Sequence, residues 1–399
     1  MEHGRTDIEI RDAQGDAELQ RFAEVDAESF AGRAASNMVW LKVGAPLAPL
    51  RLAHMDGEVV GGYMLLPVGQ FFGGKSVPAQ AVTAVAVHPA WRRRGVAGAL
   101  MHDCVALARE QGAAVAPLHA ATVRLYRRWG WEVCSMTLRQ IVRTVALAGF
   151  TGSGRVRTRP DRGAIEALRR TYLVHWDGPL DRPDWFLSVE WDAGDPEMPR
   201  FEYGWYEGDR LTGYVRYMSE RQAGGWIRLQ VQEFIATTQD ALRGLLGFLG
   251  GQESQSSDVV FVHSALVDAS PLHWLLPEPH RAIAMEGFLC WMQRIVDIDT
   301  AMTARGWPER AAGRVELEVT DPITGVDRVV LEVEGGSARV TPGGGGAIRC
   351  GIGALSAWYS SALRAQDAVR LGLLEGDADA VTAMDGLIAG GLPWLPDFF

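Results

Sequence analysis

The first 150 residues alternate between strand-like and helix-like spacing of apolar positions. Residues 9–30 indicate a strand, a turn and a helix, because an alternating run is followed by apolar residues three and four positions apart. Asp56 and Gly57 separate two β-branched runs, which is typical of a tight hairpin. A buried strand over 82–87 leads into a helix over 95–111. We therefore expect a mixed sheet flanked by helices.

The alternation continues to the end of this first unit. The pattern predicts a short strand over 115–118, a helix that ends near Gly130, and a strand over 133–142. Residues 151–163 are rich in Gly, Arg, Thr and Pro and lack apolar periodicity, so we interpret them as a linker. The first domain is accordingly expected over 1–150.

The same order of elements recurs after the linker. A helix is predicted from Ala164, paired strands turn at 207–209, and a strand from Trp226 leads into a helix capped by Thr237–Asp240. This second domain is expected over 151–289.

A third unit is expected over 290–399. Its pattern predicts a strand from Cys290 and a short helix, then alternating strands within 314–344 and helices within 355–377.

Composition is that of an ordinary globular protein. The chain has 399 residues, 47% of them hydrophobic and 22% charged, and no apolar run approaches the roughly 18 residues of a membrane-spanning helix. The net charge of −10 argues against general nucleic-acid binding. The first residues are polar, with no apolar signal core, so we expect a cytoplasmic location.

The cysteines lack metal-ligand spacing, which predicts reduced thiols and no metal; they are Cys104, Cys134, Cys290 and Cys350.

The clearest candidate chemistry lies in the turn after the 82–87 strand. The turn and the start of the helix consist of Arg92, Arg93, Arg94, Gly95, Val96, Ala97 and Gly98. A helix N-terminus offers unpaired N–H groups, small residues allow close backbone approach, and arginines add charge-assisted hydrogen bonds. These features indicate a phosphate site. The alternative is a solvated basic turn, and the spacing fits neither a P-loop nor GxGxxG.

Residues 92–97 match the Arg/Gln-x-x-Gly-x-Gly/Ala pattern of the GCN5-related N-acetyltransferases, or GNATs, and follow a strand as in that family. The resemblance implies an acetyl-CoA site whose pyrophosphate binds at this turn. It also implies main-chain contacts from Val85, Ala86 and Val87 to the rest of the cofactor. The Val85 N–H would stabilise charge on the thioester oxygen. The alternative is that these are ordinary sheet residues.

Tyr126, in the segment RLYRRWGW, falls where GNATs place a tyrosine that protonates the departing CoA thiolate. A phenol with a pKa near 10 can donate its proton to a thiolate of comparable basicity. The alternative is a helix tyrosine that packs in the core.

The three-unit order, with the arginine turn and Tyr126, resembles the Eis family of aminoglycoside N-acetyltransferases over essentially the full chain. The resemblance implies an α+β fold: two tandem GNAT-like domains, the second degenerate, followed by a sterol-carrier-protein-2-like domain. The arginine turn is missing from the second domain, so structural support or a wall of the pocket is its expected role. The family's activity is direct acetyl transfer to amines of polycationic acceptors, often at several positions. A homohexamer built of two trimers is also expected from the resemblance.

The carboxyl-terminal sequence GLPWLPDFF is apolar and stiffened by proline, which favours docking over a frayed end. The resemblance implies that the terminal carboxylate, here that of Phe399, enters the first domain's active site and acts as general base. Phe398 stands where some aminoglycoside-modifying relatives carry an acid, which leaves regiospecificity open.

A polycationic acceptor requires acidic side chains around its pocket. The candidates are Asp26 and Glu28 in the first predicted helix and Asp397 near the terminus. Solvated surface charges are the alternative for Glu28 and Asp397. Trp40 is a candidate wall for sugar rings, and His119 is interpreted as a structural histidine.

Two alternative functions stay open on the sequence. A protein-lysine or polyamine acetyltransferase would share every cofactor residue and differ in its acceptor. A lipid carrier or scaffold with a vestigial first domain would depend on the third unit instead, and the intact arginine turn counts against it. Neither a nucleic-acid partner nor membrane insertion is expected.

Overall fold

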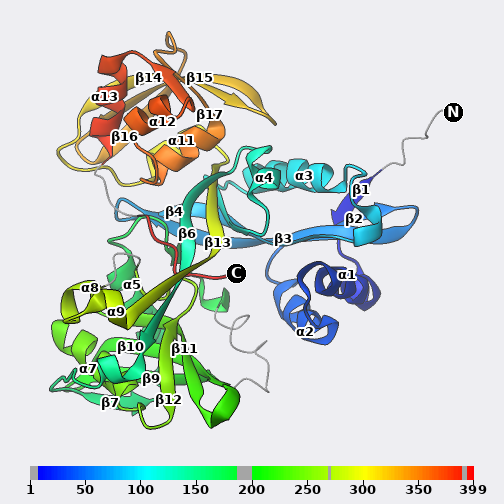
Figure 1. The fold of residues 1–399 in the computed structure, drawn as a ribbon. Helices are drawn as coiled ribbons and strands as arrows, with labels where there is room; N and C mark the ends of the chain where they lie inside the picture. The colour runs from blue at the N-terminus through cyan, green and yellow to red at the C-terminus, as the bar shows by residue number, and fades with distance from the viewer. Residues whose placement is uncertain (1–7, 187–199, 268–270, 389–392) are drawn as a thin grey trace.

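The computed structural model describes residues 8–186, 200–267, 271–388 and 393–399. In these residues the chain forms three units (Figure 1). The first two units share one 13-stranded sheet, and the third has a 5-stranded sheet of its own. Within the described ranges, no helix is long and apolar enough to cross a membrane. The mixed sheets flanked by helices confirm the expected fold class.

The first unit is a mixed sheet covered on both faces. Its strands are β1 (Glu9–Asp12), β2 (Leu50–Met55), β3 (Glu58–Phe72), β4 (Lys75–Val87), β5 (Val115–Ala120) and β6 (Glu132–Arg143). Its helices are α1 (Gly15–Phe30), α2 (Ala34–Gly44), α3 (Val96–Glu110) and α4 (Val123–Arg127). Helices α1 and α2 lie on one face, and α3 and α4 on the other (Figure 1). The hairpin at Asp56 and Gly57 is confirmed, with φ of 53° and 79°.

A strand from the second half of the chain completes the first unit's sheet. Strand β13 (Ile283–Ile295) lies between β5 and β6 and pairs antiparallel with both. Trp291 of β13 is opposite His119 of β5 and Ser135 of β6. The prediction that Cys290 opens the third domain is therefore wrong, because this residue lies inside a strand of the long sheet. Periodicity identified the strand but not its partners.

The second unit extends the same sheet beyond β6. The strands beyond β6 are β12 (Ser256–Phe261), β11 (Ile227–Ala236), β10 (Arg210–Arg221), β9 (Arg200–Glu207) and β7 (Arg155–Thr158). The short strand β8 (Leu180–Asp181) pairs with β3 instead. Its helices are α5 (Arg162–Leu173), α7 (Gln239–Gly250), α8 (Leu272–Leu275) and α9 (Pro279–Ala282). Thr238 caps α7 by accepting a hydrogen bond from the Ala241 N–H at 3.0 Å.

The stretch interpreted as a linker is partly a strand, which corrects that interpretation. Strand β7 lies within it and pairs antiparallel with β9. Its glycines serve close packing: a Cβ at Gly154 would lie 2.6 Å from Trp205 Nε1, and one at Gly152 would lie 2.5 Å from the same ring. Residues 151–163 therefore lack apolar periodicity because they contain a short edge strand and glycines that pack tightly against the Trp205 ring.

The third unit begins after β13. Its strands are β14 (Gly313–Asp321), β15 (Gly325–Glu334), β16 (Ser337–Pro342), β17 (Ile348–Gly351) and β18 (Leu374–Gly376). Its helices are α10 (Ile298–Ala304), α11 (Ile352–Tyr359), α12 (Ala365–Arg370) and α13 (Ala378–Leu387). The Ser356 hydroxyl of α11 accepts a hydrogen bond from the Ile295 N–H of β13 at 2.8 Å, which joins this unit to the long sheet. The carboxyl terminus then returns to the centre of the molecule, among the three units (Figure 1).

Candidate active site

Strand β4 carries a bulge where the site forms. Two of its residues, Ala84 and Val85, stand opposite the single β3 residue Tyr63. Ala84 has φ of +51°, in the left-handed region that non-glycine residues rarely adopt. Strand β4 pairs in parallel with β5 at Ala79 and Val82, and its residues beyond Val82 border two cavities.

The two cavities meet at this edge of β4. We call the one along the arginine turn, about 790 Å³, the turn cavity, and the one that the chain terminus enters, about 690 Å³, the tail cavity. Four residues line both cavities: Phe30, Val85, Ala121 and Tyr126. A ligand in the turn cavity and one in the tail cavity would therefore meet at Val85 and Tyr126.

The turn cavity holds nine of the ten residues expected to bind acetyl-CoA. They are Val85, Ala86, Val87, Arg92, Arg93, Gly95, Val96, Ala97 and Gly98. Arg94 is absent from its lining and stacks its guanidinium on the Trp91 ring at 4.8 Å. The Nε of Arg92 donates a hydrogen bond to the Val87 carbonyl at 3.2 Å, which ties the turn to the end of β4.

The backbone of this turn suits an anionic group. Arg93 and Gly95 have φ of +65° and +91°, and Gly95 is the N-cap of α3, so the N–H groups at the helix start are open to a ligand. A Cβ at Gly98 would lie 3.0 Å from the Trp129 ring, so glycine keeps this wall open. The buried indole N–H of Trp129, which lines the cavity, has no hydrogen-bond acceptor among the described residues. These features fit a nucleotide pyrophosphate.

Tyr126 occupies the junction of the two cavities. Its side chain comes from the short helix α4 and packs edge-on against Trp131, with ring centroids 6.1 Å apart. Burial, with a smaller contribution from Cys104, raises the pKa of the phenol well above its usual value of 10. The group is therefore a protonated phenol at neutral pH, as a proton donor must be.

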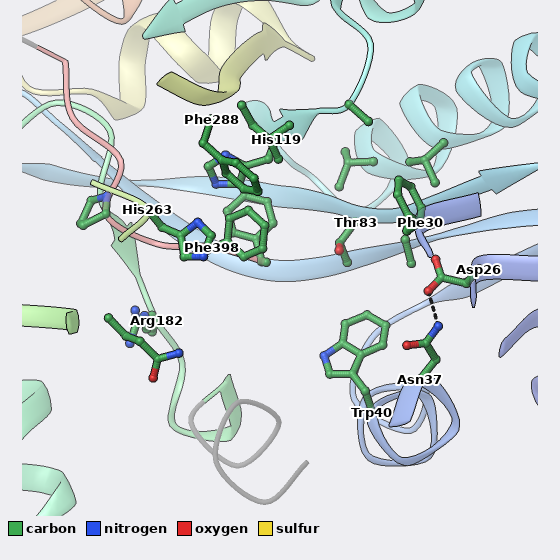
Figure 2. Close-up of a pocket in the computed structure, with 18 of the residues that line it drawn as sticks. Asp26, Phe30, Asn37, Trp40, Thr83, His119, Arg182, His263, Phe288 and Phe398 are labelled. Atoms are coloured by element: carbon green, nitrogen blue, oxygen red, sulfur yellow. Dashed lines mark hydrogen bonds between the residues drawn. The ribbon is translucent and has the colours of Figure 1, made fainter. Parts of the chain in front are cut away.

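The tail cavity is lined by the first unit, the second unit and the carboxyl terminus (Figure 2). Asp26, Trp40 and Thr83 lie on one side, and aromatic side chains from β5, the second unit and the terminus lie on the other. The aromatic side consists of His119, His263, Phe288, Phe398 and Phe399. The second unit also contributes Arg182, Arg200, Arg216 and Gln232. The second unit is thus a wall of the cavity, as expected.

Of the three acids expected around the acceptor, one lies in the tail cavity. Burial raises the pKa of Asp26 to about 6, and the Nδ2 of Asn37 donates a hydrogen bond to its carboxylate at 2.7 Å. Glu28 lies outside the lining and pairs with His88 Nε2 at 3.4 Å. Its side chain is about half exposed, so its expected role at the pocket is not supported.

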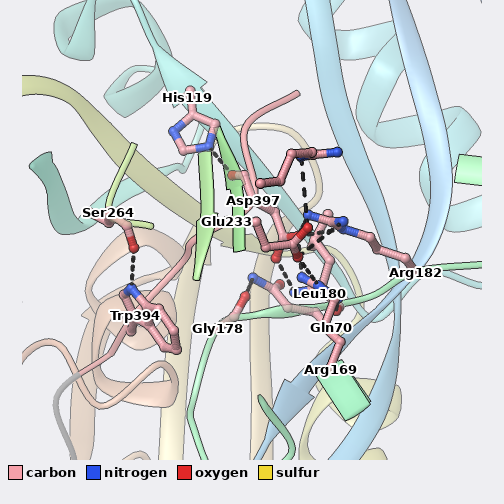
Figure 3. Close-up of polar contacts among 11 residues, drawn as sticks. Gln70, His119, Arg169, Gly178, Leu180, Arg182, Glu233, Ser264, Trp394 and Asp397 are labelled. Carbon is pink, nitrogen blue, oxygen red and sulfur yellow. Dashed lines mark hydrogen bonds and ion pairs between the residues drawn. The ribbon is translucent and has the colours of Figure 1, made fainter. Parts of the chain in front are cut away.

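Asp397 is a structural anchor rather than an acid of the cavity surface, which corrects its expected role. It is fully buried and absent from the lining. Its carboxylate accepts hydrogen bonds from Arg169, Arg182 and the Leu180 N–H (Figure 3). A carboxylate saturated in this way has no capacity for a substrate ammonium.

The end of the chain is docked, as its composition indicated. Trp394, Leu395 and Asp397 are buried. The Phe398 ring stacks on His263 with centroids 4.0 Å apart and an interplanar angle of 18°. The His119 Nε2–H donates to the Asp397 carbonyl at 2.8 Å, which confirms the structural interpretation of this histidine.

Both histidines near the terminus are neutral at pH 7. Burial lowers the pKa of His119 to about 4, and burial together with His119 and Arg139 lowers that of His263 to the same value. His119 therefore contributes a hydrogen bond and ring contacts, and His263 contributes ring contacts, both without positive charge.

Sequence reasoning missed most of the cavity wall. The missed residues include Phe30, Thr83, Arg182, Arg200, Arg216, Gln232, His263 and Phe288. They come singly from separate elements, so no local motif marks them. Among the described lining residues, Asp26 is the single acidic side chain, beside three arginines. The Nη2 of Arg216 lies 3.8 Å from the carboxylate of buried Glu233, which partly balances its charge.

Metal ligands do not gather at this site: within the described ranges, no three His, Cys, Asp or Glu side chains are grouped as a metal ion requires. All four cysteines are free thiols.

Comparisons with known proteins agree with the three-unit division. Two family models described as "Acetyltransferase (GNAT) domain" match residues 9–134 and 178–295, and one described as "Sterol carrier protein domain" matches 298–396. The second match ends at Ile295, the last residue of β13, so it also assigns this strand to the part of the chain before the third unit.

The full-length relatives are N-acetyltransferases. The "N-acetyltransferase Eis" of Mycobacterium tuberculosis is 28% identical over 362 residues, 86% of each chain. An uncharacterized N-acetyltransferase of Streptomyces avermitilis is 29% identical over 374 residues, 82% of each chain. A solved GCN5-related N-acetyltransferase from Anabaena variabilis superposes with a TM-score of 0.90 at 25% identity, covering 98% of this chain and all of that one.

The bulged strand, the arginine turn and the tail-lined cavity thus occur in a chain whose relatives share its full layout. The chain is an Eis-like member of the GNAT family of N-acetyltransferases.

Proposed function

We propose that the chain transfers the acetyl group of acetyl-CoA directly to a primary amine held in the tail cavity. The observation that carries this proposal is the junction of the two cavities at Val85 and Tyr126. GNAT acetyltransferases use acetyl-CoA, and the turn cavity has the backbone geometry and the size to hold it along β4 and α3. Acetyl-CoA would supply the acetyl group as a reactive thioester.

Three groups of the chain would divide the chemical work. As the amine nitrogen bonds to the acetyl carbon and the carbon–sulfur bond breaks, the Val85 N–H would stabilise the charge on the carbonyl oxygen. Tyr126 would give its proton to the departing thiolate. The α-carboxylate of Phe399, whose residue lines the tail cavity, would take the proton that the amine loses.

A carboxylate is a weak base for an amine proton. The usual pKa of an α-carboxyl group is near 3.5, far below that of an alkyl ammonium ion. The group would therefore act on an amine that is already neutral, or through a water molecule. In either case the turnover rate should follow the neutral fraction of the acceptor amine.

The first acceptor class that we propose is an aminoglycoside-like polycation. The likeness to the Eis proteins over 86% of the chain supports it, as do Asp26 and Trp40 on one side of the tail cavity. A small polyamine or a lysine side chain would use the same reacting groups.

A second acceptor class is favoured by the arginines of the second unit. Arg182 lies on the side of the cavity away from Asp26 (Figure 2), and Arg200 and Arg216 also line the cavity. Guanidinium groups bind carboxylate and phosphate well. An amine that carries an anionic group would place its two ends accordingly, with the amine near Asp26 and the anion near the arginines.

The test is free-thiol release from acetyl-CoA by the purified protein with a panel of amines. The panel contains kanamycin, spermidine, a lysine peptide and glucosamine 6-phosphate, with Tyr126→Phe as the matched variant. We expect release with at least one amine and a decrease in kcat of about 100-fold in Tyr126→Phe. Kanamycin and glucosamine 6-phosphate distinguish the two acceptor classes.

Absence of both thiol release and acetyl-CoA binding would refute the proposal and favour a carrier or scaffold role. The cytoplasmic location and the hexamer remain predictions. The hexamer is expected from the family resemblance, and analytical ultracentrifugation tests it.

A further inference from the structure

The chain terminus reaches the tail cavity by crossing the second unit. Trp394 is fixed there by two hydrogen bonds: its Nε1 donates to the Ser264 carbonyl at 2.7 Å, and its N–H donates to the Asp177 carbonyl at 2.9 Å. Its ring packs edge-on against Trp176, with centroids 5.3 Å apart. Residue 394 is therefore fixed, and the position of the residues after it depends on further contacts.

Asp397 is held from two sides (Figure 3). From the second unit, Arg169 donates to its Oδ1, the Nε of Arg182 donates to the same oxygen at 2.7 Å, and the Leu180 N–H donates to Oδ2 at 2.8 Å. From the first unit, His119 donates to its backbone carbonyl at 2.8 Å. Both the side chain and the main chain of residue 397 are thus fixed.

The charges around this contact depend on Asp397. Arg169 and Arg182 are almost fully buried, and they share two carboxylates, those of Asp397 and Glu233. The arginines outweigh the effect of burial on Glu233 and lower its pKa to about 2, so it is ionised. Without Asp397, Arg169 and Arg182 would lose one of the two carboxylates that they share.

This arrangement specifies the register of the tail. A buried ion pair adds little net stability over an apolar contact, but it penalises any alternative that leaves a charge unpaired. If the carboxyl-terminal segment bound one residue out of register, Pro396 or Phe398 would face Arg169 and Arg182. The two guanidinium groups would then lose the carboxylate of Asp397. Only the observed register pairs both guanidinium groups with Asp397. In that register Phe398 stacks on His263 and Phe399 lines the tail cavity.

We infer that Asp397 is a positioning residue for acetyl transfer. Arg169, Arg182, the Leu180 N–H, His119 and His263 form a tail seat that fixes Asp397 and Phe398, and thereby places Phe399 in the tail cavity. This inference rests on the proposed function, in which the carboxylate of Phe399 takes the amine proton. It also gives the second unit, which lacks the arginine turn, a function as the receptor of the chain terminus.

The direct test is Asp397→Asn in the full chain, with Asp321→Asn as the matched control. Asp321 is a buried partner of a buried arginine, Arg294, at 2.7 Å in another part of the molecule, so its loss perturbs stability without touching the seat. We expect kcat to fall at least tenfold in Asp397→Asn, with the Kd for acetyl-CoA unchanged. In Asp321→Asn, kcat should stay within twofold of the wild-type value.

A double-mutant cycle separates positioning from other effects. If Asp397 acts only through the terminus, Asp397→Asn causes no further decrease in kcat once Phe399 has been deleted. Carboxypeptidase A, which releases terminal aromatic residues, should remove Phe399 at least tenfold faster from Asp397→Asn than from the wild type or Asp321→Asn.

Two outcomes would overturn the inference while leaving the proposed function intact. One is a wild-type kcat in folded Asp397→Asn, and the other is that Asp397→Asn lowers kcat as much in the Phe399-deleted chain as in the full chain. A wild-type protein that transfers no acetyl group would instead refute the proposed function. If Asp397→Asn does not fold, Phe398→Ala tests the same seat, because 39% of Phe398 is exposed and its loss does not threaten the core. We then expect at least a fivefold decrease in kcat at unchanged Tm, and wild-type kcat would overturn the inference.

Discussion

Burial, rather than a charged neighbour, determines the protonation of Asp26. Its pKa is raised from 3.8 to about 6, so between these values the folded chain binds a proton that the unfolded chain releases. Stability should therefore decrease as pH rises from about 4 to 6 and stay level above that. The shift corresponds to ~3 kcal/mol at most, which partial exposure reduces to about 1–2 kcal/mol.

Asp26→Asn should abolish this part of the pH dependence. From pH 4 to pH 7, the free energy of unfolding in urea should fall for the wild type because Asp26 loses its proton. In the variant this fall should be smaller by about 1–2 kcal/mol. Glu28→Gln, on the same helix but outside the cavity, is the control and should behave as the wild type. Identical pH profiles for Asp26→Asn and the wild type would show that this carboxyl is not held in its neutral form.

The positions of single residues were predictable from the sequence where a local motif fixes them. The arginine turn, Val85 and Tyr126 lie together because strand, turn and helix follow each other along the chain. Asp397 could not be interpreted in this way, because its partners Arg169 and Arg182 are more than 200 residues away. An isolated aspartate in a tail has the same local pattern whether it is solvated or buried.

At the scale of elements, the bulge in β4 is the feature on which the site depends most. Ala84 adopts φ of +51° there. A β-branched residue is strained in this region, whereas glycine adopts it without strain. We expect Ala84→Val to lower the free energy of unfolding by about 1–3 kcal/mol and, by displacing Val85, to lower kcat about tenfold.

Ala84→Gly is the matched variant. Its free energy of unfolding should stay within about 1 kcal/mol of the wild-type value, and its kcat should stay within twofold. Chemical denaturation and thiol release measure the two effects. An Ala84→Val variant that is as stable and as active as Ala84→Gly would show that the bulge has no role in the site.

Periodicity predicted many of the strands and helices, although it gave no element for α2, β12 or α13, and it says nothing about which strands pair. Strand β13 alternates as any half-buried strand does, so the sequence suggested a new domain at Cys290. The structure instead inserts it between β5 and β6. The same limit explains β7, a short edge strand whose glycines allow contact with Trp205 and resemble a linker in composition.

At the scale of the whole molecule, the site requires all three units. The first contributes the turn cavity and Tyr126, the second contributes the tail seat, and the terminus that follows the third enters the tail cavity. Sequence resemblance predicted this long return of the chain. The tail seat could not be predicted, because it forms only when elements distant in sequence pack together.

The most direct test of this arrangement is the rate of thiol release, with a saturating amine, for two variants of the terminus. One lacks Phe399, and the other carries a single glycine after it, which moves the carboxylate by one residue while leaving Asp397 in place. We predict that kcat falls by about 100-fold in both variants and that the Kd for acetyl-CoA stays unchanged. Wild-type kcat in both would contradict a catalytic role for the chain terminus.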